Sequence, residues 1–308
     1  MSPRCLICLG DLDAGTEYHV TCLDELFGAY VKPAIDVEVA RLHTVGLAMV
    51  GRTSLSGVQR KVSLSLEGDR MTLRLAVARG QYILKPQAGV FPELPENEHV
   101  SLRIARRVGL DVPPSGLLRL KDGTLAFIVR RFDRRADGSK RLQEDFCQLA
   151  QRSPKDKYRG SAELCARVIK RYADEPIVEA AKLFRLMVFG WWIGDGDAHL
   201  KNFSLLRGDD GRYRLSPVYD RLSTRLVIPD DRLALPVGGR DEGLTAAGWR
   251  EYATYCGLPE RAARRVVGEI VSAAPGARDL VARSFLSPEL REAYGALLTE
   301  RAEVLAGF

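Results

Sequence analysis

The hydrophobic pattern changes near residue 140, and this change constrains the fold more than any other feature of the sequence. Between residues 58 and 132, apolar and polar residues alternate in short runs, which is the period of a strand with one buried face. Beyond residue 140, apolar residues recur at helical spacing instead. The sequence therefore predicts an α+β chain with a small β-rich N-terminal lobe and a larger helical C-terminal lobe.

The order of elements can be predicted in both parts. In the first part, Gly109 is a natural helix stop, and Gly68 and Asp69 mark a turn. The expected elements there are a hairpin over 62–66 and 71–75, a strand over 82–86, a helix over 96–108 and a hairpin around 121–124. In the second part they are helices over 143–151, 162–172 and 178–193, a hairpin over 203–216, and helices from 245 onward with breaks near 257 and 275.

Composition excludes several classes of protein. The longest nearly unbroken apolar run, 186–193, is far shorter than the roughly 20 residues that span a bilayer. The first residues lack the apolar core of a secretory signal, so we expect a soluble cytoplasmic protein without a membrane partner. The six cysteines are too sparse for a disulfide scaffold. The net charge of +6 fits either phosphate-rich partners or an ordinary solvated surface.

The densest chemical signal is GDGDAHLKNFS, directly after the apolar helix predicted over 178–193. Asp197 and Asn202 have the DxxxxN spacing of a kinase catalytic loop, and Asp220 follows after two predicted strands, where a second metal-binding acid belongs. Asp195 is a rival for the base, but it lies two residues too far from Asn202 for this pattern. The alternative is that these residues only form turns and caps.

A kinase also needs a cation for the α and β phosphates of ATP. Lys85 in the predicted strand YILKP fits this role, with Glu98 or Glu96 of the next helix as its partner. The preceding SLSGVQRK segment contains Gly57 and lies where a phosphate-covering loop would be. It matches neither a P-loop nor a protein-kinase glycine loop, so a chance turn remains an alternative.

The N-terminal segment carries a possible metal site. Cys5, Cys8, His19 and Cys22 form two closely spaced pairs and offer three thiols and one imidazole, a set suited to structural zinc. The alternative is a short subdomain in which these residues are simply buried.

Several other residues carry expectations that are mostly structural. We expect His99 on the surface of a helix and His199 in the loop beside Asp197, among the nucleotide-contacting residues. Trp191 and Trp192 are more typical of packing than of base stacking. The remaining three cysteines, Cys147, Cys165 and Cys256, are expected in the core.

These motifs together resemble the HipA family of bacterial serine/threonine toxin kinases, over about residues 50–240. The resemblance is carried by SLSGVQRK, ILKP, ENE at 96–98, RRFDR at 130–134, QEDFCQ at 143–148, DAHLKNFS and the dipeptide Tyr219–Asp220. It implies a protein-kinase-like fold with two lobes. It further implies ATP phosphates at Lys85, a catalytic base at Asp197, magnesium at Asn202 and Asp220, adenine beside Arg131 and Phe132, and autophosphorylation at Ser54 or Ser56.

The resemblance is strongest to the short HipT-type kinases, because only about 50 residues precede the SLSG loop. We accordingly expect a short Cys/His subdomain over 1–28, an N-lobe over 29–134 and a C-lobe over 135–308. The implied partners are a small antitoxin that resembles the missing N-terminal subdomain, a helix-turn-helix protein and a protein substrate such as an aminoacyl-tRNA synthetase, without direct nucleic-acid binding. Alternatives are a nucleotide-binding regulator without catalysis and a small-molecule phosphotransferase.

Overall fold

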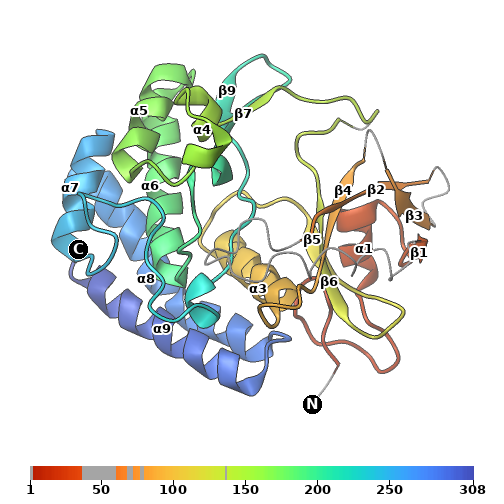
Figure 1. Ribbon diagram of the computed structural model, residues 1–308. Coiled ribbons are helices and arrows are strands. Elements are labelled where there is room, and N and C mark those ends of the chain that lie inside the picture. Colours follow the sequence, from red (N-terminus) through yellow and green to blue (C-terminus); the bar gives the residue numbers. More distant parts are fainter. Residues whose placement is uncertain (1–2, 37–59, 68–71, 77–79, 136) are drawn as a thin grey trace. The chain divides into compact units, whose positions relative to one another are not determined.

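The computed structural model describes residues 3–36, 60–67, 72–76, 80–135 and 137–308 (Figure 1). The chain forms two compact units. The first comprises residues 1–103, 113–140 and 283–286, and the second comprises 104–112, 141–282 and 287–308. Among the described residues, no helix has both the length and the apolarity to cross a membrane.

The first unit is built on a six-stranded sheet with the order β1-β3-β2-β4-β6-β5. The strands are β1 (Ala34–Asp36), β2 (Val62–Leu66), β3 (Thr72–Leu75), β4 (Tyr82–Pro86), β5 (Ser115–Arg119) and β6 (Leu125–Arg130). Both predicted hairpins and the strand YILKP are confirmed. The sequence missed β1, which pairs in parallel with β3 over three residues, because so short a segment shows no alternation.

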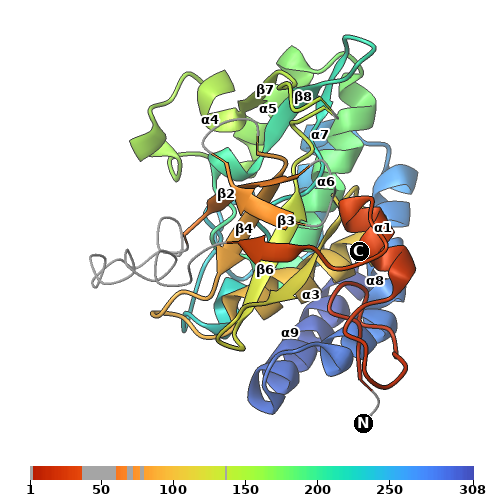
Figure 2. The same ribbon diagram turned by 90° about the vertical axis from the view of Figure 1, so that its right-hand side faces the viewer.

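Two helices contribute to this unit, the second of them only up to residue 103. Helix α1 (Val20–Phe27) ends at Gly28, whose φ of 64° is the left-handed conformation that glycine adopts without strain. Helix α3 (Leu94–Arg107) begins two residues before its predicted start at 96. Pro95 lies in its first turn, where the missing N–H leaves no helical hydrogen bond unmade. Figure 2 shows both helices together with the strands.

The expectation that His99 lies on the surface of a helix is wrong. His99 is fully buried on α3, and its Nε2 lies 2.8 Å from the carbonyl oxygen of Ile7. A carbonyl only accepts, so Nε2 must carry the proton. Burial lowers the pKa of His99 to about 4, which keeps the ring neutral. Sequence alone could not reveal this burial because the covering loop comes from more than 90 residues earlier.

The second unit is centred on α6 (Pro176–Ile193), which packs against α5, α7 and α9 (Figure 1). The other elements are β7 (Gln143–Asp145), β8 (Ser204–Arg207), β9 (Tyr213–Leu215), α4 (Phe146–Leu149), α5 (Ala162–Tyr172), α7 (Ala246–Cys256), α8 (Glu260–Arg283), α9 (Pro288–Ala306), and short 3₁₀ turns at Pro154–Asp156, Leu200–Asn202 and Thr224–Leu226. Most of α6 is buried, as expected. Trp191 and Trp192 are part of this packing, and the indole N–H of Trp192 donates to the carbonyl of Leu298 at 2.9 Å. Cys147, Cys165 and Cys256 are buried too.

The helix predicted over 143–151 is wrong in its first third. Residues Gln143–Asp145 form β7, which pairs antiparallel with β8, so pairing with a distant strand overrides the local preference. Asp145 then caps α4, because its side chain accepts from the N–H of Gln148 while the Gln148 side chain accepts from the N–H of Asp145. Only the short helix Phe146–Leu149 follows.

The helix break expected near residue 275 is also wrong, because α8 continues through Pro275. Its buried face runs past the proline on both sides, at Ile270, Ala274, Ala277 and Val281. Packing of this face therefore outweighs the one backbone hydrogen bond that a proline removes.

Replacing Pro275 by alanine should stabilise the protein. The side chain is exposed, so alanine restores a helical N–H without disturbing a buried contact. We expect a gain of about 1–3 kcal/mol in urea-induced unfolding. Pro288→Ala is the matched control, since Pro288 lies in the first turn of α9 and removes no helical bond. Equal effects of the two substitutions would contradict this account of α8.

Candidate active site

The end of helix α6 delivers the GDGDAHLKN segment. Gly194 ends the helix with φ at 77°, a conformation that favours glycine. A Cβ at this position would also lie 2.7 Å from Leu297 Cδ2, so both the backbone and the packing require glycine. The 3₁₀ turn Leu200–Asn202 follows. Its cap is closed by Asn202, whose Oδ1 accepts from the N–H of His199 at 3.1 Å while its own N–H donates to the His199 carbonyl at 2.9 Å. The backbone around Asn202 is therefore fixed locally.

Arg221 ties this segment to the next loop. Its guanidinium donates to Asp195 Oδ2 and to the Asn202 carbonyl, each at 3.0 Å, and lies 4.4 Å from the ring centroid of Phe203. Arg221 and Asp195 are each only 1% exposed. Burial raises the pKa of Asp195 to about 7, against the lowering effect of Arg221. Asp195 is thus committed to a buried ion pair with Arg221.

Asp197 has different surroundings although it lies only two residues away. It is incompletely buried, and its Oδ1 accepts from the hydroxyl of Tyr158 at 2.5 Å. Burial raises the pKa of Asp197; Tyr158 and Lys157 oppose this, whereas the negative charges of Asp231 and Asp220 add to it. A carboxylate of raised basicity, held by one hydrogen bond, has the properties of a general base.

Asp220 is the second predicted magnesium ligand, and the adjacent Arg221 donates to the backbone carbonyl of Asn202, the first one. Its backbone is left-handed at φ 53°, which is uncommon for a residue other than glycine and is found preferentially at functional sites. The neighbouring Tyr219 hydroxyl donates to the Lys201 carbonyl at 2.8 Å and bonds to Ser204 Oγ at 2.5 Å, which holds the Asp220 loop beside the 3₁₀ turn. A carboxylate and an amide oxygen are ligands that Mg²⁺ accepts, so the donor set fits this ion.

His199 is buried beside these groups. It is 5% exposed and packs edge-on against Tyr158 with ring centroids 5.1 Å apart. Burial, then the charge of Lys157, lowers the pKa of His199 to about 4, so the imidazole is neutral. In the structure it packs against Tyr158 and lies at the start of the 3₁₀ turn that contains Asn202.

Sequence reasoning missed several residues that shape this site. Tyr158 lies 39 positions before Asp197, in a segment without a periodic signal. Thr224 accepts from the N–H of Gly196 at 2.7 Å and donates to Asp231. A Cβ on Gly196 would lie 2.0 Å from Asp231 Oδ2, so Gly196 is required for this close approach.

In the first unit, Lys85 on β4 is paired with Glu98 on α3. Both side chains are almost completely buried, at 3% and 1% exposure, and the Lys85 ammonium also lies 5.4 Å from the ring centroid of Phe127. The sequence left Glu96 and Glu98 open, and the structure selects Glu98. Glu96 Oε2 is buried without a hydrogen-bond partner among the described residues.

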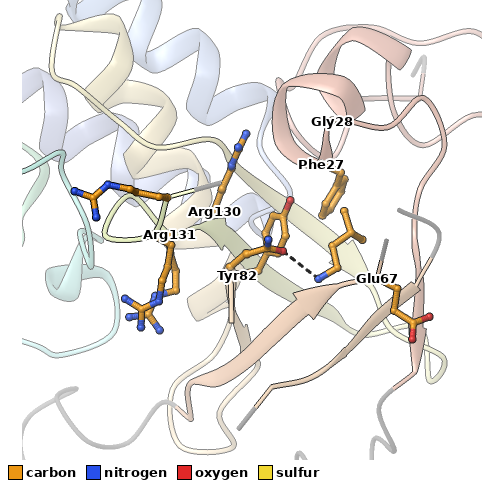
Figure 3. A pocket seen from close by; sticks show the side chains of 10 residues that line it. Phe27, Gly28, Glu67, Tyr82, Arg130 and Arg131 are labelled. Atoms are coloured by element: carbon orange, nitrogen blue, oxygen red, sulfur yellow. Dashed lines mark hydrogen bonds between the residues drawn. The ribbon is translucent and has the colours of Figure 1, made fainter. Parts of the chain in front are cut away.

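A pocket of about 360 Å³ in the first unit is rich in arginine. Arg130 and Arg131 line it, with Glu67 on the opposite side from Arg131 (Figure 3). The Arg131 guanidinium donates two hydrogen bonds to the Asp133 carboxylate, one to each oxygen, at 2.8 and 2.7 Å. Phe132 is half-buried and is not among the described residues that line the pocket. Ser54, Ser56 and Gly57 lie outside the described residues.

Comparison with known proteins identifies the family. The model of the HipA-like C-terminal domain matches residues 53–278. The chain belongs to the HipA-like family. Two proteins of Sinorhizobium fredii named as kinases, Y4mE and Y4dM, are 34% and 32% identical to it over 71% and 70% of this chain. The chain spans about half of their length, 54% and 56% respectively.

Solved structures agree with the family at the level of the fold. HipA of Shewanella oneidensis, determined with HipB and operator DNA, matches with a TM-score of 0.73 at 20% identity, over 96% of this chain and 80% of its own. The kinase CtkA of Helicobacter pylori matches with a TM-score of 0.55 at 17% identity, over 73% of this chain and 89% of its own. The expected α+β kinase-like fold of this HipA-like chain is thereby confirmed.

Replacing Glu96 by glutamine should stabilise this HipA-like protein at neutral and higher pH. Burial raises the pKa of Glu96 to about 7, whereas glutamate in an unfolded chain titrates near about 4.3. Between these values the folded protein holds more protons than the unfolded chain, so its stability falls as pH rises. Glutamine removes this loss, and we expect a gain on the order of 1 kcal/mol above about pH 7 that disappears below about pH 4.

Urea unfolding across this pH range measures the effect. Glu289→Gln is the control, because Glu289 is an exposed acid in the first turn of α9. A gain for Glu96→Gln that does not change with pH would contradict the assignment of a raised pKa.

Proposed function

We propose that the chain is an ATP-dependent serine/threonine kinase with Asp197 as its catalytic base. The observation that carries the proposal is that two neighbouring acids have different surroundings. Asp195 is buried against Arg221, whereas Asp197 is less buried and its carboxylate accepts a hydrogen bond from the Tyr158 hydroxyl instead of pairing with a cation. Membership of the HipA-like family and the kinase names of relatives support the same activity.

In this proposal Asp197 accepts the proton of the attacking hydroxyl. The Tyr158 hydroxyl donates to one carboxylate oxygen, and in this proposal the other oxygen accepts the proton. Burial makes the carboxylate more basic than one in water and so better suited to take a proton in the transition state.

In this proposal the remaining polar residues bind ATP and its magnesium ion. Asn202 and Asp220 would hold Mg²⁺, which supplies positive charge to the β and γ phosphates. Lys85 would bind the α and β phosphates, and Glu98 fixes the direction of its ammonium group. Arg131 and Phe132 are proposed as adenine contacts and Gly57 as part of the phosphate-covering loop. His199 is proposed as a nucleotide-contacting residue through its place beside Asp197.

The biological role is proposed by analogy with relatives. We infer a toxin kinase of the short subgroup, which phosphorylates a serine on a translation enzyme such as an aminoacyl-tRNA synthetase and is controlled through Ser54 or Ser56. HipA of Shewanella oneidensis was determined with HipB and operator DNA. A helix-turn-helix DNA-binding partner is proposed for this chain by analogy with that complex, and a small antitoxin by its resemblance to the short HipT-type kinases.

Asp197→Ala should abolish transfer of labelled γ-phosphate to protein. Loss of a general base lowers the rate by about 10²–10⁴-fold, and we expect this loss with Mg-ATP binding retained. Asp209→Asn is the matched control, because Asp209 is an exposed acid in the β8–β9 turn of the same unit. Label in unmodified protein or added synthetase, absent only from Asp197→Ala, supports the proposal.

Nucleotide binding without any transfer by the unmodified protein would contradict the kinase proposal and favour a regulator. Transfer to small alcohols alone would instead favour a small-molecule phosphotransferase.

A further inference from the structure

The N-terminal Cys/His residues converge in space, as their two pairs in the sequence suggested. The ligand atoms of Cys5, Cys8, His19 and Cys22 all lie within 4.8 Å of one another. His19 Nδ1 is 3.2 Å from Cys8 Sγ and 3.8 Å from Cys22 Sγ. Tetrahedral zinc, with bonds of about 2.3 Å to sulfur and about 2.0 Å to nitrogen, requires sulfur-to-nitrogen separations of about 3.5 Å. The side chains thus already have the spacing of one coordination sphere.

Backbone N–H groups point at the sulfurs of this cluster. Cys5 Sγ lies 3.5 Å from the N–H groups of both Ile7 and His19, and Cys8 Sγ lies 3.4 Å from that of Gly10. A Cβ on Gly10 would lie 3.1 Å from the His19 ring and 3.2 Å from Cys8 Sγ, so glycine allows this close turn. Sulfurs that accept hydrogen bonds in this way are suited to the thiolate form, which is the form that binds a metal.

The tautomer of the His19 imidazole also suits metal binding. His19 Nε2 lies 2.9 Å from the carbonyl oxygen of Asp11, which can only accept, so Nε2 carries the proton. The lone pair is then on Nδ1, the atom that faces the thiols. A metal-ligating histidine characteristically donates its other N–H to such a carbonyl.

The simple packing alternative predicts another pattern. Cys147 is a buried cysteine of the second unit, and its thiol donates to the carbonyls of Arg152 and Ser153. In the N-terminal cluster the sulfurs instead meet N–H donors and an imidazole lone pair. All four cysteines compared here are free thiols, so a disulfide does not explain the cluster either.

We propose that Cys5, Cys8, His19 and Cys22 bind a structural Zn²⁺ ion. The two ligand pairs come from different elements, the tight turn at Cys5–Gly10 and the start of α1, so the ion would join them. All four positions are filled by protein atoms, which is characteristic of structural rather than catalytic zinc.

The turn that the ion would hold is packed against the proposed nucleotide-binding part of the first unit. The Leu6 carbonyl accepts from the N–H of Leu117 at 2.8 Å, so the turn covers the edge strand β5. A Cβ on Gly116 would lie 2.6 Å from Ile7 Cγ1, which shows how closely the two approach. The Ile7 carbonyl accepts from His99, the residue directly after Glu98. Zinc would therefore also stabilise the part of α3 that carries Glu98.

Elemental analysis of the purified full chain tests the proposal. We expect about one zinc per chain in unmodified protein and in Cys147→Ser, and less than about 0.2 in Cys8→Ser. Zinc below about 0.2 per unmodified chain, iron in its place, or a Cys8→Ser protein with undiminished zinc would each overturn it.

Cobalt substitution keeps the proposal testable should Cys8→Ser fail to fold. Unmodified protein reconstituted with Co²⁺ should show the intense visible bands of a tetrahedral thiolate complex and a thiolate-to-cobalt charge-transfer band. A pale octahedral spectrum would overturn the assignment. Neither readout depends on kinase activity, so failure of the zinc site and failure of the kinase proposal remain distinguishable.

Discussion

The geometry of the candidate active site in the second unit depends on the contacts of one buried group, the guanidinium of Arg221. It contacts Asp195 just after the end of α6, the carbonyl of Asn202 in the 3₁₀ turn, and the ring of Phe203, which directly precedes β8. Both charges are removed from water, so neither is tolerated without the other; loss of one partner of such a pair typically destabilises a protein by about 3–5 kcal/mol. The same ion pair therefore also helps to position Asp197, two residues after Asp195, and Asp220, directly before Arg221.

This arrangement explains how two aspartates in one short segment have different chemistry. Asp195 forms a buried ion pair with Arg221. Asp197 instead accepts a hydrogen bond from a tyrosine hydroxyl and lies near other negative charges. The backbone supports the division: Gly194 turns the chain at positive φ, and Gly196 lets Asp231 approach where any side chain would collide. The two glycines are therefore as necessary to the site as Asp195 and Asp197, the acids that follow them.

Much of this could be predicted from the sequence, and the failures have physical causes. Alternating and helical periodicity predicted β2 to β6, α5, α6 and the β8–β9 hairpin, because these elements bury a regular face. Strand β7 and the unbroken α8 depend on tertiary contacts that override local signals at Gln143 and Pro275. Spacing singled out Asp197, Asn202 and Asp220, but Tyr158 and the burial of His99 depend on distant segments and leave no pattern in the chain.

A double-mutant cycle on Asp195 and Arg221 tests the central claim most directly. The free energy of unfolding is measured for the unmodified protein, Asp195→Asn, Arg221→Met and the double variant, above the Asp195 pKa of about 7 so that the carboxylate is ionised. If the pair holds the loops together, the two substitutions should show a coupling energy of about 1–3 kcal/mol, with the double variant more stable than the sum of the single effects predicts. Effects that add to within about 0.5 kcal/mol would contradict the account.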